Sequence, residues 1–88
     1  MAIRLSRVDP AKNMARFYEL DIQTGLFGDV CVARHWGRIG ANGQGKEHWL
    51  DNEAKAVELA SKLERQKRLR GYSSPLSSPT YSEKLTHR

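Results

Sequence analysis

The sequence has one cysteine, three prolines and no long hydrophobic run. Cys31 cannot form an internal disulfide, and its apolar segment 30–33 holds no other metal-ligating residue, so we expect a small buried side chain. Charged residues interrupt the N-terminal segment 1–7, which argues against a signal peptide, and no apolar stretch approaches membrane-spanning length. We therefore expect a cytoplasmic protein without a membrane partner.

The chain also lacks the residue constellations that enzymes and metal sites use. Three scattered histidines show no ligand spacing: His35, His48 and His87. Four carboxylates lie in or beside expected turns, without apolar surroundings to raise a pKa: Asp21, Asp29, Glu47 and Asp51. The glycine-rich segment 40–45 is no P-loop, because Glu47 follows Lys46. We expect no catalytic residue, metal, cofactor or small-molecule substrate.

What the chain does have is an excess of positive charge over a single-domain length. Its 88 residues suit one small domain, and the formal net charge is +5. A basic surface attracts polyanions, of which nucleic acid and anionic membrane are the most common. The alternative is a cationic surface that only keeps the protein in solution.

Alternating apolar and polar side chains predict strands over residues 2–8, 14–22, 30–38 and 46–50. The connections are too short for crossover helices, so we predict a four-stranded antiparallel β-meander. In the connection before the third strand, Leu26 and Phe27 are apolar enough to pack back on the sheet. Asn42-Gly43 predicts a type I′ hairpin turn before the fourth strand.

A helix follows the last strand, with Asp51 or Asn52 as its N-cap and Gly71 at its end. An apolar stripe occurs at helical spacing: Ala56, Leu59, Ala60 and Leu63. This stripe must pack on one face of the sheet, which predicts an α+β domain. Four-residue spacing pairs Glu58 with Lys62 and Glu64 with Arg68.

The composition changes after Tyr72. Residues 73–88 are rich in serine and proline and offer almost nothing to bury. We therefore assign the folded domain to residues 1–72 and expect a disordered tail over 73–88. The tail could serve solubility alone or carry a short contact motif.

One tripeptide carries binding chemistry. Trp36 offers a flat face for stacking, Gly37 lets another backbone approach closely, and Arg38 supplies a fork of donors for phosphate. The alternative is structural, with Trp36 in the core, Gly37 in a bulge and Arg38 on the surface.

This region resembles the WGR domain family, named for the same tripeptide. The similar segments are Asn13-Met14-Ala15-Arg16-Phe17-Tyr18, Leu26-Phe27-Gly28, Trp36-Gly37-Arg38-Ile39-Gly40 with Gly43-Gln44, and Lys67 to Gly71-Tyr72. The resemblance covers about residues 2–72. It is closer to small bacterial proteins containing only this domain than to the poly(ADP-ribose) polymerases, since no catalytic or zinc-finger region accompanies it here.

In those polymerases the similar domain helps to bind DNA ends. The resemblance implies that Trp36 packs against a sugar at a strand end, that Arg38 bridges to DNA or a neighbouring domain, and that Gly37 holds their geometry. Because the rest of such an enzyme is missing here, the role at DNA breaks transfers only weakly.

We therefore expect a non-enzymatic module that binds nucleic acid, with DNA as the first candidate. The residues expected to contact it are Trp36, Gly37, Arg38, Arg34, Gln44, Lys62, Arg65 and Arg68. The three helix cations among them rest on charge alone. The alternative is a protein-interaction or regulatory module that anchors a protein partner through the same tryptophan and arginine.

Overall fold

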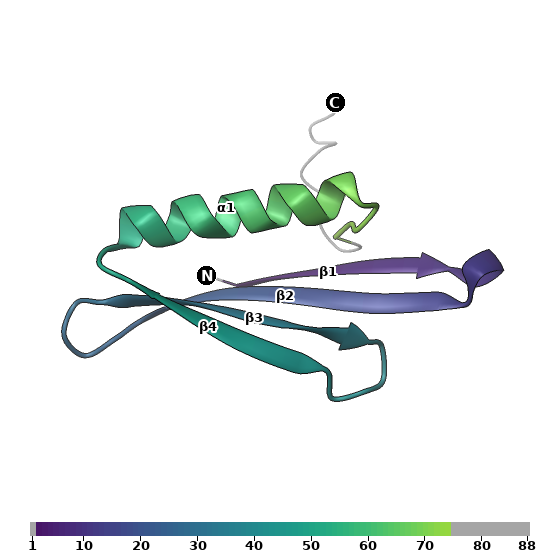
Figure 1. The fold of residues 1–88 in the computed structure, drawn as a ribbon, viewed down its shortest axis with the longest axis horizontal. Helices are drawn as coiled ribbons and strands as arrows, with labels where there is room; N and C mark the ends of the chain where they lie inside the picture. The colour runs from purple at the N-terminus through teal and green to yellow at the C-terminus, as the bar shows by residue number, and fades with distance from the viewer. Residues whose placement is uncertain (1, 75–88) are drawn as a thin grey trace, which may run out of the picture.

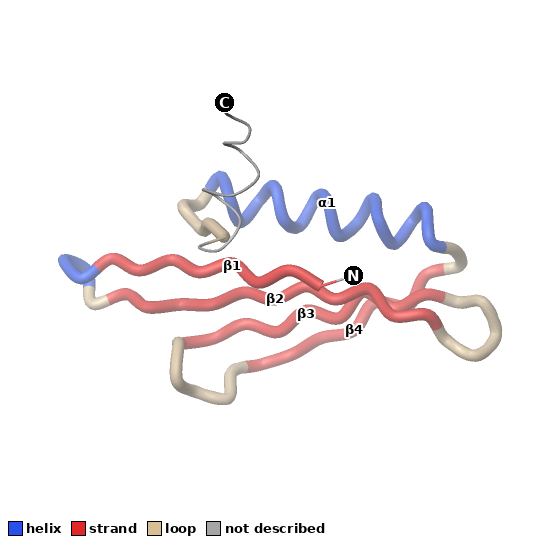
Figure 2. The backbone as a smooth tube through the Cα atoms, turned by 180° about the vertical axis from the view of Figure 1, so that it is seen from behind, coloured by secondary structure: helices blue, strands red, loops and turns tan. Residues whose placement is uncertain are grey.

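Four antiparallel strands pair in chain order, and one helix crosses a face of the sheet, in the computed structural model (Figures 1 and 2). The structure describes residues 2–74. Its elements are β1 (Ala2–Asp9), the 3₁₀ turn η1 (Pro10–Lys12), β2 (Met14–Thr24), β3 (Val30–Arg38), β4 (Gln44–Leu50) and α1 (Glu53–Leu69). The predicted α+β meander with a C-terminal helix on one face is confirmed.

The strand register decides which side chains share a face. Leu5 lies opposite Tyr18, Tyr18 opposite Trp36, and Trp36 opposite Gln44, so this row crosses all four strands. Opposed residues of antiparallel strands point to the same face. Tyr18 is fully buried in the core that includes residues of α1, and the whole row therefore belongs to the helix-covered face.

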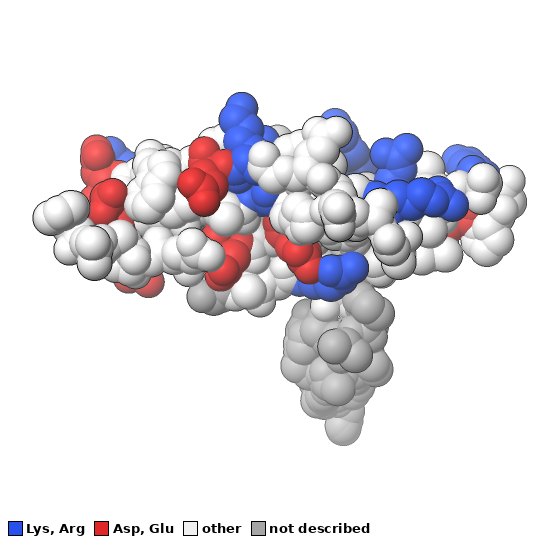
Figure 3. Space-filling model, turned by 90° about the horizontal axis from the view of Figure 1, so that it is seen from below, with Lys and Arg blue, Asp and Glu red and all other residues white. Residues whose placement is uncertain are grey.

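On the face of the molecule drawn in Figure 3, the two ends differ in charge. One end carries the β2–β3 loop and the start of α1, and the other carries the β3–β4 loop and the end of α1 (Figure 1). In Figure 3 most of the acidic side chains lie toward the first end and most of the basic ones toward the second. A polyanion would therefore meet the second end more favourably.

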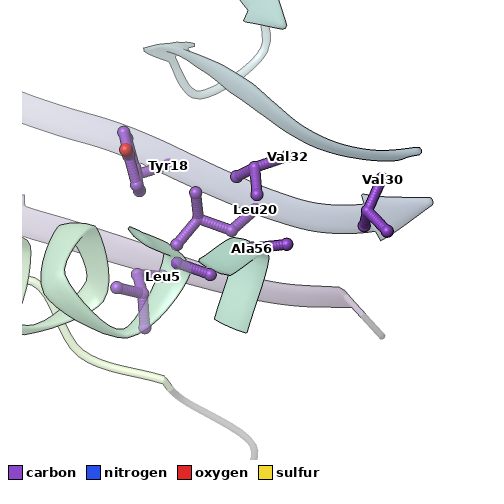
Figure 4. Close-up of a cluster of buried hydrophobic side chains, with 7 residues drawn as sticks. Leu5, Tyr18, Leu20, Val30, Val32 and Ala56 are labelled. Carbon is purple, nitrogen blue, oxygen red and sulfur yellow. The ribbon is translucent and has the colours of Figure 1, made fainter. Parts of the chain in front are cut away.

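The core lies between α1 and the sheet. Its strand residues are Leu5, Tyr18, Leu20, Val30 and Val32, and its helix residues are Ala56 and Ala60 (Figure 4). Two alanines at the contact let the helix backbone approach the strands closely, because they add little side-chain bulk. Leu59 and Leu63 pack against the same cluster, which confirms the predicted stripe.

Both ends of α1 have identifiable caps. Asn52 is the N-cap, and its side-chain oxygen accepts a hydrogen bond of 2.9 Å from the backbone N–H of Lys55. After the helix, Gly71 takes a φ of +97°, which glycine adopts without steric cost. Of the two predicted pairs along the helix, Arg68 Nε lies 2.8 Å from the Glu64 carboxylate. Among the described residues, the other predicted pair forms no ion pair.

The predicted type I′ turn at Asn42-Gly43 is wrong. Gly43 has a positive φ of 75°, but Asn42 does not lie in the left-handed region. The chain turns earlier, where the N–H of Ala41 donates to the carbonyl of Arg38 at 2.9 Å and Gly40 has a φ of +94°. β3 pairs with β2 as far as Arg38 but with β4 only as far as Trp36, so the connecting loop spans 39–43 and β4 begins at residue 44 rather than 46.

The expectation that Leu26 and Phe27 pack back on the sheet is also wrong. Their side chains are 95% and 92% exposed. The N–H of Gly25 donates to the carbonyl of Asp29 at 2.7 Å, which closes the β2–β3 loop at its base. The two apolar residues therefore project from the tip of the loop.

Beyond the helix the chain returns to the sheet edge. Ser73 pairs with Ser6 of β1 through backbone hydrogen bonds of 2.8 and 2.9 Å. From residue 75 onward, the predicted tail lies outside the described residues. Within the described part, α1 is neither long nor apolar enough to cross a membrane.

Candidate nucleic-acid interface

A hollow of about 460 Å³ opens beside the Trp-Gly-Arg tripeptide. It is lined by Arg16, Trp36, Gly37, Arg38, Gly43 and Gln44. We call it the tryptophan hollow. Trp36 is partly buried and packs against the core cluster, so it supports the fold and lines the hollow at the same time. The structural and binding interpretations of this tryptophan are therefore compatible.

Two of the glycines that line the tryptophan hollow lie against each other. A Cβ atom on Gly37 would lie only 2.7 Å from the Cα atom of Gly43. On Gly43 it would lie 2.4 Å from the carbonyl oxygen of Trp36. The close backbone approach predicted at Gly37 is confirmed, and it brings the loop 39–43 against the end of β3.

Three arginines lie side by side in a row that ends beside Trp36, with which Arg16 and Arg38 line the tryptophan hollow. Arg7 is the register partner of Arg16, and Arg16 is the register partner of Arg38. Like charges directly opposite one another destabilise a sheet. Within residues 2–74, none of the three pairs with a carboxylate. This row presents a concentration of positive charge that no carboxylate of the described residues pairs with.

A second hollow, of about 280 Å³, adjoins the first through Arg16. It is lined by Arg7, Met14, Arg16, Lys67, Arg70 and Tyr72. We call it the cationic hollow. Among residues 2–74, no aspartate or glutamate lines either hollow. Together the two hollows form a continuous surface on the helix-covered face of the sheet, at the basic end of the molecule.

Lys67 reaches into the cationic hollow from the last turn of α1. Its ammonium lies 4.8 Å from the ring centre of Tyr18 and 5.3 Å from that of Tyr72, where the ring faces attract a cation. Burial lowers the pKa of Lys67, and the charges of Arg70, Arg34 and Arg16 lower it further. A bound anion would offset this mutual repulsion.

Arg34 also belongs to this face. Its guanidinium lies 5.1 Å from the ring centre of Trp36. Its Nε atom is buried without a hydrogen-bond partner among the described residues. Nearby on β4, burial lowers the pKa of His48, and the charges of Arg34 and Lys46 act in the same direction. Arg34 therefore adds charge behind the tryptophan while stacking on it.

The structure does not bring the three predicted helix cations to the hollows. Lys62, Arg65 and Arg68 are exposed, and none of them lines either hollow. Arg68 is paired with Glu64. Among the predicted residues, Trp36, Gly37, Arg38 and Gln44 lie together, and Arg34 contacts the ring of Trp36.

Sequence reasoning missed four cations of this surface: Arg7, Arg16, Lys67 and Arg70. Arg16 shares the strand parity of Tyr18, which was a signal that it points to the helix-covered face. Similarly, Lys67 continues the helical spacing of Ala56, Ala60 and Leu63. These cations lie far apart in the sequence and only the fold gathers them.

The described residues contain no cluster of the side chains that usually bind metal ions. No group of three or more histidine, cysteine, aspartate or glutamate side chains gathers there to hold a metal ion. The hollows present cations, an indole ring, a phenol ring and an amide. This set of groups can bind an anionic, partly aromatic ligand.

Comparisons with known proteins place the chain among its relatives. A family model described as "WGR domain" matches residues 1–79. The uncharacterized protein y4dW of Sinorhizobium fredii (strain NBRC 101917 / NGR234) is 52% identical over 68 residues, or 77% of this chain and 33% of that protein. The chain thus spans about a third of the length of this relative. No solved structure matches this chain.

Proposed function

Since this chain belongs to the WGR domain family, we propose that it binds nucleic acid, with DNA as the first candidate, across the tryptophan and cationic hollows. The observation that carries the proposal is the arginine row beside Trp36. Arg7, Arg16 and Arg38 are adjacent, like-charged and unpaired with any carboxylate in residues 2–74. Phosphates would relieve that repulsion, and a base or sugar would stack on the indole.

Each group has a role in this proposal. Arg38 and Arg16 contact phosphate, with Gln44 as a hydrogen-bonding partner to sugar, base or phosphate. Trp36 supplies the stacking surface, and Arg34 supports its ring. Gly37 allows the loop to approach. In the cationic hollow, Lys67 and its neighbours continue the phosphate track. Lys62, Arg65 and Arg68 are proposed as outlying contacts that only a longer strand would reach. No step of this role requires a cofactor or catalysis.

Fluorescence anisotropy with short labelled oligonucleotides tests the proposal. Single-stranded and duplex DNA and RNA are titrated from low to physiological salt. We expect Arg16→Ala to weaken binding about tenfold, comparable with the loss of one charged hydrogen bond. The slope of log K against log salt should fall by about 1. The matched control is Arg65→Ala, which removes the same charge outside both hollows and should change binding to a short strand less than twofold.

The two tryptophans provide an independent readout. Trp36 lines the hollow, whereas Trp49 is 55% exposed and pairs with Cys31 on the opposite face of the sheet. In a Trp49→Phe protein, saturating oligonucleotide should quench the emission of Trp36. In a Trp36→Phe protein whose folding is verified by circular dichroism, the emission of Trp49 should hardly change. Quenching of Trp49 alone would place the ligand on the wrong face.

The salt dependence of binding distinguishes specific nucleic-acid binding from general charge attraction. Binding that persists near physiological salt and depends on Arg16 supports nucleic acid as the ligand. Binding that disappears at modest salt and is equally sensitive to Arg16→Ala and Arg65→Ala is charge attraction alone. That second outcome would overturn the proposal and favour a protein partner for the same face.

A further inference from the structure

The face of the sheet opposite α1 carries a row of interacting polar side chains. Arg4, Glu19 and His35 are register partners on β1, β2 and β3. The guanidinium of Arg4 donates to one carboxylate oxygen of Glu19. The other oxygen lies 3.1 Å from Nδ1 of His35. The row therefore continues by hydrogen bonds from the edge strand to the middle of the sheet.

His35 extends this row to the loop 39–43. Its Nε2 lies 2.5 Å from the backbone carbonyl oxygen of Asn42. A carboxylate and a carbonyl are both acceptors, so both ring nitrogens must donate. Neutral imidazole carries only one N–H, and only the imidazolium donates from both. The geometry thus fits the protonated form of His35.

The loop that His35 holds forms one wall of the tryptophan hollow. Gly43 and Gln44, which follow Asn42, both line that hollow. Gly43 lies against Gly37 and the ring of Phe17. Phe17 is 3% exposed, although its strand face has no covering helix. The row on one face of the sheet is therefore packed directly behind the candidate site on the other.

The ring of Phe17 contacts both His35 and Arg4 of the polar row. The imidazole of His35 meets it edge to face at 5.0 Å between ring centres. The guanidinium of Arg4 lies 4.7 Å from the centre of the same ring. His35 is consequently fixed by contacts with the ring, the carboxylate and the loop carbonyl. A side chain with three contacts can hold the loop 39–43 in one place.

We infer that His35 is a positioning residue for the tryptophan hollow. Its imidazolium hydrogen-bonds to the Asn42 carbonyl and thereby keeps Gly43 and Gln44 in the positions that bind the ligand. This inference rests on the proposed function for its ligand, but the link between His35 and the loop does not. When His35 loses a proton, one of its two hydrogen bonds is lost. The loop then loosens, and the hollow binds nucleic acid less tightly.

The charges around His35 set the direction of the pH effect. The hydrogen bond to Glu19 raises the pKa of His35, as does the bond to the Asn42 carbonyl, while the charge of Arg4 opposes them. On the β4 side the register partner is Gly45, and the next residue on this face is Glu47. Because the folded pKa is raised, the link is complete below the ordinary histidine pKa and is lost as pH rises through the raised value.

The first experiment needs no nucleic acid. Backbone ¹⁵N–¹H spectra of the free protein are recorded from pH 5.5 to 8.5, together with the His35 ring signals. The amides of Gly43 and Gln44 should titrate with the same midpoint as His35. They should also titrate in His48→Gln, the matched control on the other face, and remain unchanged in His35→Gln. If the amides of Gly43 and Gln44 do not titrate with His35, the inference is overturned, whatever the protein binds.

The second experiment measures affinity over the same pH range at constant salt, with oligonucleotides that lack terminal phosphates so that the ligand itself does not titrate. Affinity should fall about three- to tenfold with the midpoint of His35 in the unmodified protein and in His48→Gln. In His35→Gln it should be constant and low, because the amide can keep only one bond. Binding that is pH-independent despite a titrating loop overturns the positioning role. A titrating loop with no binding at any pH supports the link and shows that the proposed function is what fails.

Discussion

Gly37 and Gly43 approach so closely that a Cβ atom on Gly37 would lie 2.7 Å from the Cα atom of Gly43. The atom that blocks it is backbone, so no side-chain rotation can relieve the clash. We expect Gly37→Ala to destabilise the protein by about 1 to 3 kcal/mol, the usual cost of overpacking. Urea denaturation measures the change.

The matched control for that prediction is Gly45→Ala on the neighbouring strand. There the nearest atom to a new Cβ is the carbonyl oxygen of Arg34 at 3.3 Å, which requires only a small adjustment. The Gly37 variant should therefore unfold at a clearly lower urea concentration than the Gly45 variant. Equal urea midpoints for the two variants would show that the loop 39–43 moves easily and that the contact between Gly37 and Gly43 does not fix its position.

The two phenylalanines should respond in opposite ways to truncation. Phe17 is 3% exposed against His35 and Arg4, whereas Phe27 is 92% exposed at a loop tip. Phe17→Ala should cost about 3 kcal/mol or more, because it leaves a cavity. Phe27→Ala should stay within about 0.5 kcal/mol. Thermal and urea unfolding of both variants test this, and a large loss for Phe27→Ala would mean that the tip packs on the protein after all.

Asn52 rather than Asp51 caps the helix, and substitution should distinguish them. The Asn52 side chain accepts from the N–H of Lys55 at 2.9 Å, and its removal should cost about 1 kcal/mol. Asp51 makes only an exposed ion pair of 3.6 Å with the Lys55 ammonium, so Asp51→Ala should cost no more than about 0.5 kcal/mol. Urea denaturation of Asn52→Ala and Asp51→Ala side by side gives the comparison. The reverse order of stabilities would reject the cap.

Cys31 should be almost inert in the folded protein. The side chain is fully buried, and burial raises the pKa of its thiol, so little thiolate exists near pH 7. Labelling with a thiol-specific reagent should be on the order of a hundredfold slower than in urea-unfolded protein, because it requires opening of the structure. Rapid labelling of the native protein would contradict the burial of the Cys31 side chain.

Much of the fold could be predicted because its signals are local. Alternation of apolar residues depends on neighbours two positions apart, and it located all four strands. The stripe with Ala56 and Leu63 depends on one helical period and indicated which side packs on the sheet. The loops were less predictable. The tip with Phe27 projects because of a hydrogen bond at the base of its loop, which composition does not reveal.

The sequence by itself determined the strand order, the buried side of the helix, the burial of Cys31 and the place of the Trp36–Arg38 tripeptide in the third strand, since each follows from a short-range pattern. Only the tertiary structure decided which cations share the site. Arg7, Arg16 and Arg38 become neighbours through strand register, and Lys67 joins them through the docking of α1. Register depends on the lengths and geometries of turns, and a shift of one residue would turn the arginine of the shifted strand to the opposite face.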